Sequence, residues 1–88
     1  MKLILAIVNA DAVDPVSRAL VEQRFTVTQI SSMGSFLRRG NTTLVIGVQE
    51  TQVESALEVI RNACKPLKTS DVHPATIFVI DAAQFVQI

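Results

Sequence analysis

The sequence predicts an α+β protein in which strands and helices follow in the order β-α-β-β-α-β. Four short runs of branched or aromatic apolar residues have the length and composition of strands: residues 2–8, 25–30, 41–48 and 75–80. Between them, residues 11–23 and 51–64 repeat apolar side chains at helical spacing. This order is that of the ferredoxin-like fold, an antiparallel four-stranded sheet with two helices on one face.

The first half of the chain supplies a strand, a helix and a second strand. The run KLILAIV at residues 2–8 is too short for a helix and rich in branched side chains. Asp14 is expected to cap the first helix and Pro15 to take its first position. In residues 25–30, Phe25 and Val27 alternate with threonines, as in a strand with two unlike faces.

The second half supplies a loop, a strand, a helix and a last strand. Residues 31–40 (SSMGSFLRRG) have the small and polar composition of a loop. The run Thr51-Gln52-Val53-Glu54 matches a capping box, so the second helix is predicted to begin at Thr51 and to close at Lys65-Pro66. After the strand at 75–80, residues 85–88 are expected to form a short terminal strand or an extension.

Composition limits the class of protein. A chain of 88 residues that is 49% hydrophobic is one folded domain, residues 1–88. Its 8 basic and 8 acidic residues cancel, which argues against polymeric nucleic acid or an anionic membrane as the main partner. The apolar run near the start is too short for a signal peptide or a membrane span. We therefore expect a cytoplasmic protein without membrane insertion.

The first and last strands are apolar on both faces. In residues 2–8 and 75–80, successive residues are almost all apolar, whereas a half-solvated antiparallel strand alternates apolar with polar. Two helices cover only one face of the sheet. We expect a second copy of the chain to cover the other face. The alternatives are an unusually apolar solvent face and cover by the chain's own loops.

No set of residues predicts catalysis or a cofactor. Cys64 falls on the apolar stripe of the second helix, where packing is its expected role. His73 is the only histidine and has no Cys or His companion to form a metal site. Asp11 and Asp14 lie at a helix start, where carboxylates favour the positive end of the helix dipole. The serines between 31 and 35 have no assigned base, so we expect no enzyme.

The loop at residues 31–40 has the chemistry of a nucleotide site. Phe36 offers a flat surface to a base, Arg38 and Arg39 can pair with phosphates, and Asn41 can hydrogen-bond to a base edge. Its small residues let a ligand approach backbone N–H groups. The alternative is an ordinary loop whose Phe36 packs on the core and whose arginines are solvated.

Several segments resemble the cyclic-di-AMP receptor family of PII-like signalling proteins. They are residues 1–8 (MKLILAIV), 34–43 (GSFLRRGNTT), 46–48 (IGV) and 75–79 (ATIFV). The resemblance covers essentially the whole chain, and the run Phe-Leu-Arg-x-Gly-Asn-Thr-Thr is its specific part. It implies a single PII-like domain, a ferredoxin-like protomer, a homotrimer and a dinucleotide pocket at each subunit interface.

The resemblance also assigns ligand contacts by position. They fall on Thr28, Phe36, Leu37, Asn41, Gly47 and Phe78, whose types are retained, and on Ser35, where the family usually has glycine. Thr26 stands where the family usually has arginine, and Arg24 stands where the family usually has asparagine. Arg24, two positions earlier on the same predicted strand face, is a candidate replacement for that arginine. The connection from Cys64 to Thr76 is much shorter than the long loop of the family.

The resemblance implies a PII-like signal-transduction protein without catalytic activity. It would bind a nucleotide at its subunit interfaces, with cyclic di-AMP as the favoured ligand, and regulate a downstream protein that the sequence does not identify. Three alternatives stay open: a ligand-free trimeric scaffold, a PII-like protein for another adenine nucleotide or a metal, and an RNA-binding ferredoxin-like domain. The last is disfavoured because the net charge is zero and, apart from Phe78, the first and fourth predicted strands lack exposed aromatics on which bases stack.

Overall fold

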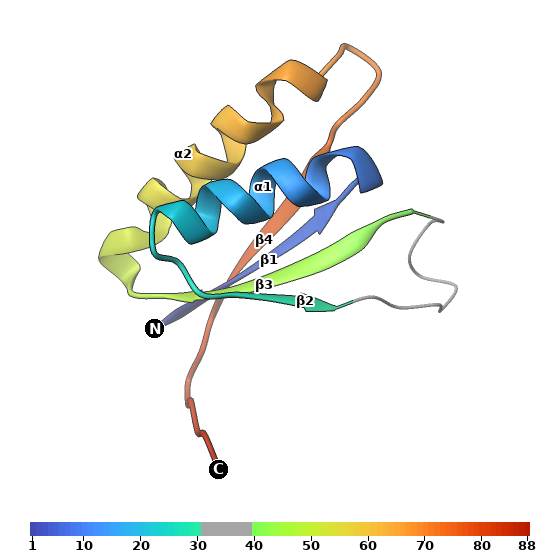
Figure 1. The fold of residues 1–88 in the computed structure, drawn as a ribbon. Helices are drawn as coiled ribbons and strands as arrows, with labels where there is room; N and C mark the ends of the chain where they lie inside the picture. The colour runs from blue at the N-terminus through green and yellow to red at the C-terminus, as the bar shows by residue number, and fades with distance from the viewer. Residues whose placement is uncertain (31–39) are drawn as a thin grey trace.

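The computed structural model describes residues 1–30 and 40–88 and has the predicted order of elements (Figure 1). The strands are β1 (Lys2–Val8), β2 (Val27–Ile30), β3 (Thr42–Val48) and β4 (Ala75–Asp81). The helices are α1 (Ala10–Glu22) and α2 (Val53–Cys64), and two 3₁₀ turns, η1 (Glu50–Gln52) and η2 (Lys65–Leu67), flank α2. The strands form one antiparallel sheet in the order β2-β3-β1-β4, with both helices on one face. The ferredoxin-like α+β arrangement is confirmed.

Strand β1 lies at the centre of the sheet and is apolar on both faces. It pairs along its whole length with β3 and with β4. Alternate side chains point toward the helices and are fully buried, while the others lie on the opposite face and are half-buried. The buried set is Ile4, Ala6 and Val8, and the set on the opposite face is Leu3, Leu5 and Ile7.

The core lies between the sheet and the two helices. Each helix presents one stripe of buried residues spaced four apart, which is the spacing that places side chains on one helix face. The stripe is Ala12, Val16 and Leu20 in α1, and Ala56, Ile60 and Cys64 in α2. Cys64 is 7% exposed and packs in this core, as predicted.

Helix α1 begins before the predicted cap. Asn9 has an extended backbone and is the N-cap residue, and its carbonyl accepts the Ala12 amide at 2.9 Å. Pro15 lies inside the helix, so the prediction that Asp14 caps it and Pro15 starts it is wrong. Proline removes one backbone donor, whose acceptor would be the carbonyl of Asp11. Both Asp11 and Pro15 are exposed, so the loss falls on the solvated side of the helix.

Helix α2 begins through the 3₁₀ turn η1. The capping box is formed by Gln49 and Gln52: the Gln49 amide donates to Gln52 Oε1 at 3.1 Å, and the Gln52 amide donates to the Gln49 side chain. The predicted box at Thr51 to Glu54 is wrong because the chain already turns at Glu50. The α-helix proper therefore starts at Val53.

The residues after β4 form an extension and not a strand. Residues 82–88 have no regular structure and run away from the domain (Figure 1). The Ala82 amide still donates to the Met1 carbonyl at 3.0 Å, which continues the β1–β4 pairing by one step. Beyond it, Phe85 and Val86 are more than half exposed.

Candidate functional site

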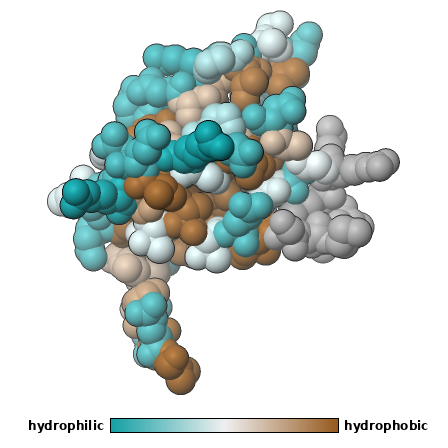
Figure 2. All heavy atoms as spheres, in the orientation of Figure 1, coloured by the Kyte–Doolittle hydropathy of each residue, from teal (hydrophilic) through white to brown (hydrophobic). Residues whose placement is uncertain are grey.

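The sheet face that the helices leave uncovered is largely apolar, as predicted. We call it the open sheet face. Three of its large side chains are about half exposed: Phe78 by 52%, Ile30 by 48% and Ile80 by 44%. Its other apolar members are Leu3, Leu5, Ile7 and Val45. In Figure 2, apolar side chains, drawn in brown, gather on the body below the helices and again at the end of the C-terminal extension.

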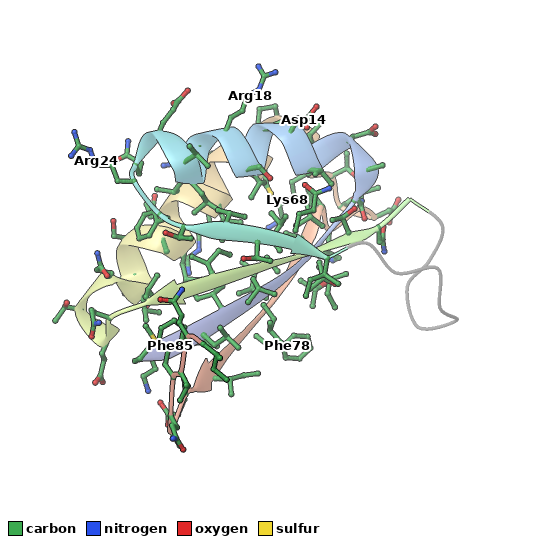
Figure 3. All side chains as sticks on the ribbon, turned by 60° about the horizontal axis from the view of Figure 1, so that its bottom comes forward. Asp14, Arg18, Arg24, Lys68, Phe78 and Phe85 are labelled. Carbon is green, nitrogen blue, oxygen red and sulfur yellow. The ribbon has the colours of Figure 1, made fainter. Side chains whose placement is uncertain are left out.

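Strand register places Thr28 and Phe78 in one row across the open sheet face. Thr28 in β2 pairs with Val45 in β3, Val45 with Leu5 in β1, and Leu5 with Phe78 in β4. Figure 3 shows Phe78 on the side of the sheet away from the helices. Neighbouring strands lie about 4.8 Å apart, so three steps separate Thr28 from Phe78 by about 14 Å. The two residues therefore lie at opposite edges of the face.

Gly47 lies on the same face and is the diagonal neighbour of Thr28. It pairs with Leu3, two positions along β3 from Val45. A Cβ added at Gly47 would meet only Met1 Cε, at 3.9 Å, which is an ordinary contact. Packing within the chain therefore does not require glycine here. The space above Gly47 is open to a ligand or a second subunit.

Asn41 lies at the far end of β3, beside a shallow hollow. The hollow measures about 460 Å³, and Asn41 lines it together with Ile7, Asn9, Ala10, Asp11, Gly40, His73 and Thr76. Gly40 has a φ of 89°, a left-handed conformation that favours glycine, and so turns the chain into β3. Asn41 and Gly47 are six positions apart on an extended strand, or about 20 Å. One chain therefore presents them at opposite ends of its sheet.

The remaining predicted ligand contacts are Ser35, Phe36 and Leu37. All three fall within residues 31–39, which lie outside the described residues. Their roles stay predictions that rest on the resemblance.

Arg24 does not stand where the sequence suggested. It lies in the turn between α1 and β2 with a φ of 68°, and its amide donates to the Val21 carbonyl at 2.9 Å. This left-handed position ends the helix. In Figure 3 its side chain projects from the end of α1 away from the sheet. The prediction that Arg24 shares a strand face with Thr26 and replaces the family's arginine is wrong, because β2 begins only at Val27.

An ion pair joins β1 and β4 at the end of the sheet opposite Asn41. Lys2 Nζ donates to Asp81 Oδ1, and the two residues are direct partners in the β1–β4 register. This hydrogen bond raises the pKa of Lys2 above 10.5 and lowers the pKa of Asp81 below 3.8. The pair lies at the last step of the β1–β4 ladder, whose register puts Phe78 opposite Leu5 on the open sheet face.

In residues 1–30 and 40–88, no three His, Cys, Asp or Glu side chains lie close enough together to hold a metal ion. Burial raises the pKa of the Cys64 thiol, which keeps it protonated and unreactive. Over the same two ranges, no helix combines the length and the apolar character needed to cross a bilayer.

The fold and the open sheet face together define a ferredoxin-like domain with an exposed apolar surface. The family model described as "Cyclic-di-AMP receptor" matches residues 1–70. The chain belongs to the cyclic-di-AMP receptor family. Among solved structures, that of a functionally unknown protein from Pediococcus pentosaceus is similar, with 30% sequence identity and a TM-score of 0.77. The similarity covers 99% of this chain and 96% of that one, so it includes β4, which the family match does not reach.

Sequence reasoning named Thr28, Gly47 and Phe78 as ligand contacts but did not show which side chains lie between them. Leu5 and Val45 occupy the middle of the row from Thr28 to Phe78. The alternation of residues along each strand gives the face of every side chain. Only the register says which of them are neighbours across the sheet, and the sequence does not contain it directly.

Proposed function

We propose that this chain is a PII-like signalling protein that assembles as a homotrimer in the cytoplasm and binds cyclic di-AMP between its subunits. Family membership supports the class of ligand. In this proposal the protein has no catalytic step of its own, needs no cofactor, and acts by regulating a downstream protein. Oligomerisation is supported by the open sheet face, because soluble monomers seldom leave a contiguous apolar face uncovered.

The separation of the predicted contacts carries the proposal that the pocket lies between subunits. Thr28 and Gly47 are neighbours, but Phe78 lies across the sheet from Thr28 and Asn41 lies at the other end of β3. A single small molecule that uses all four residue types therefore needs more than one chain to supply them. Binding at such a position ties the relative placement of the subunits to ligand occupancy. The ligand then shifts the population toward one arrangement of the surface offered to a partner.

A ligand-free trimeric scaffold is the second candidate, favoured by the connection between α2 and β4. It is short and closed by local hydrogen bonds: the hydroxyl of Thr69 accepts the amides of Asp71 at 3.3 Å and Val72 at 3.1 Å. The family's long loop at this position has no counterpart here. If that loop is needed for ligand response, the chain would keep the trimer without the switch.

Light scattering and calorimetry separate the two candidates. We expect a mass of three chains at micromolar concentration and heat on titration with cyclic di-AMP but not with cyclic di-GMP. Ligand at 100 times its dissociation constant should stabilise the fold by about 2.7 kcal/mol. Thr28→Ala should weaken binding, whereas Thr51→Ala, an exposed threonine in η1, should not.

Two results would overturn the proposal. A stable monomer would remove the subunit interface altogether. A trimer that gives no heat at millimolar ligand, either as the natural chain or as Ser35→Gly, would establish the scaffold instead. The glycine variant belongs in this test because it restores the residue that the family usually has at that position.

A further inference from the structure

A second cavity lies on the helix side of the sheet, between the end of α2 and the start of β4. We call it the helix-side cavity, and it measures about 270 Å³. Its floor is apolar and consists of Ile60, Cys64, Pro74, Ala75 and Ile77. Its rim is formed by Arg61, Lys65, Lys68 and His73. Among the described residues of the proposed nucleotide site, Thr28, Asn41, Gly47 and Phe78, none lines it.

The rim is a local excess of positive charge. Three of the chain's eight lysines and arginines line this cavity, and none of its Asp or Glu residues does. Because the whole chain balances 8 basic against 8 acidic residues, composition alone would mix the two signs. The Arg61 guanidinium forms ion pairs with the carboxylates of Glu58, at 3.4 Å, and Glu54, at 4.0 Å. Within the described part of the chain, no such partner offsets Lys65 or Lys68.

Stabilisation of the helix explains only part of this cluster. Basic residues in and just after the last turn interact favourably with the negative end of a helix dipole, which accounts for Arg61 and Lys65. Lys68 and His73 lie beyond the helix, on the connection to β4, where the dipole gives no reason for the charge of Lys68. Their side of the cavity is held in place by backbone bonds. The Thr69 amide donates to the Val72 carbonyl at 3.3 Å, and the Asn9 amide to the Pro74 carbonyl at 2.8 Å.

We infer that the helix-side cavity is a binding site for a small organic anion, separate from the nucleotide site. The apolar body of the ligand contacts Ala75 and Ile77, which are partly exposed, and its carboxylate or phosphate group lies against Lys65 and Lys68. Pockets that bind small molecules typically have an apolar lining with a few convergent polar groups, and their volumes are about 300–1,000 Å³. At 270 Å³ this cavity suits a ligand of about one ring, not a dinucleotide.

Four probes test the inference on the full chain by two-dimensional amide NMR. Benzoate and phenyl phosphate carry the two anionic groups on one apolar body, benzyl alcohol is the neutral counterpart, and inorganic phosphate lacks the body. We expect saturable shifts at the amides of residues 60–77 with at least one aromatic anion at millimolar concentration. The stronger of the two identifies the anionic group. We expect at least tenfold weaker binding of benzyl alcohol and of inorganic phosphate.

Matched variants assign the charge. Lys65→Gln and Lys68→Gln should each weaken the bound anion about tenfold, as expected for one hydrogen bond to a charged group. Arg18→Gln is the control, because Arg18 is an exposed cation on α1 that does not line the cavity (Figure 3). Equal shifts with benzoate and benzyl alcohol, no saturable shift with either anion, or lysine variants that behave like Arg18→Gln would each overturn the inference.

Discussion

Gly47 is a strand residue whose missing side chain nothing in its own chain explains. Its nearest neighbour leaves room for a Cβ, and β-branched residues favour strands. Gly47→Val should therefore keep the fold but intrude on whatever occupies the open sheet face. Overpacking typically costs 1–3 kcal/mol, so we expect cyclic di-AMP to bind about ten- to a hundredfold more weakly by calorimetry.

The control for Gly47→Val is Thr51→Val, at an exposed position of η1 away from the open sheet face. It should retain the affinity of the natural chain. Circular dichroism checks that both variants are folded. Unchanged affinity in Gly47→Val would place the ligand elsewhere.

Phe36 and Asn41 should contribute to binding in different ways. Stacking of a base on an aromatic ring is worth about 1–3 kcal/mol, so Phe36→Ala should weaken cyclic di-AMP by about ten- to a hundredfold. Asn41→Ala should weaken it by about tenfold, because a polar edge of the ligand loses its partner. Asn62→Ala, an exposed asparagine on α2, serves as the control for calorimetry. Loss of the trimer in either variant would contradict a role confined to the ligand.

Residue faces were predictable from the sequence where strands are regular and not where a helix ends. Thr28 and Phe78 have the strand positions that alternation gives them, because one face of each strand must meet the helices. The position of Arg24 was predicted wrongly because, where glycine is absent, no residue type in the sequence marks a left-handed helix end. An arginine with φ of 68° adopts the conformation that glycine usually supplies.

The start of α2 offers a direct comparison between sequence pattern and structure. Gln52→Ala removes the acceptor of the Gln49 amide and should lower the free energy of unfolding by about 1 kcal/mol, the usual effect of losing a helix cap. Thr51→Ala should change it by less than about 0.5 kcal/mol, because Thr51 is an exposed residue of η1. Urea denaturation measures both variants. A larger loss of stability in Thr51→Ala than in Gln52→Ala would support the capping box at Thr51 to Glu54 that the sequence suggested.

The pairing of β1 with β4 carries a pH dependence through Lys2 and Asp81. Asp81 has a lowered pKa in the folded chain, so its contribution to stability is present above pH 3.8 and is lost as the pH falls through the folded value. Lys2 has a raised pKa, so its contribution is present below pH 10.5 and is lost as the pH rises above it.

The variant Asp81→Asn isolates this ion pair. It should be less stable than the natural chain near pH 7, and the difference should shrink toward zero at pH 2. Because the pair is exposed, the difference should also fall in 1 M salt. Chemical denaturation at the two pH values checks the first expectation. A difference that stays constant with pH would mean that the amide disturbs the strand for another reason.

Element order was predictable because strands and helices have different apolar periods, but element boundaries were not. The 3₁₀ turn at Glu50 and the early start of α1 at Ala10 both depend on how the chain leaves a strand. Those exits are set by the position of the sheet relative to the helices, which is a property of the packed molecule. Local patterns such as Asp14-Pro15 therefore predicted helix starts at positions where no helix begins in the folded chain.

At the scale of the whole molecule, the two faces of β1 should respond differently to a charge. Leu5→Lys places an ammonium group on the open sheet face, where the side chain is partly exposed in a single chain. It should leave a folded monomer that no longer associates. Ile4→Lys places the same group in the core at 0% exposure, and an unpaired buried charge should unfold the chain.

Light scattering and circular dichroism together check this contrast. Thr51→Lys, a lysine on an exposed turn, should leave both the trimer and the fold unchanged. A Leu5→Lys variant that remains a trimer would show that the open sheet face is not the interface. In that case another surface would have to account for assembly.

The sheet topology has a consequence for the chain while it is being made. Leu5 of β1 comes well before its two partners, Val45 and Phe78, along the chain. Until those partners are made, both edges of β1 are unpaired, and the run from Leu3 to Val8 contains no charge and no proline. Such segments aggregate readily. Variants that delay the docking of β4 should therefore reduce the yield of soluble protein before they measurably reduce the stability of the finished fold.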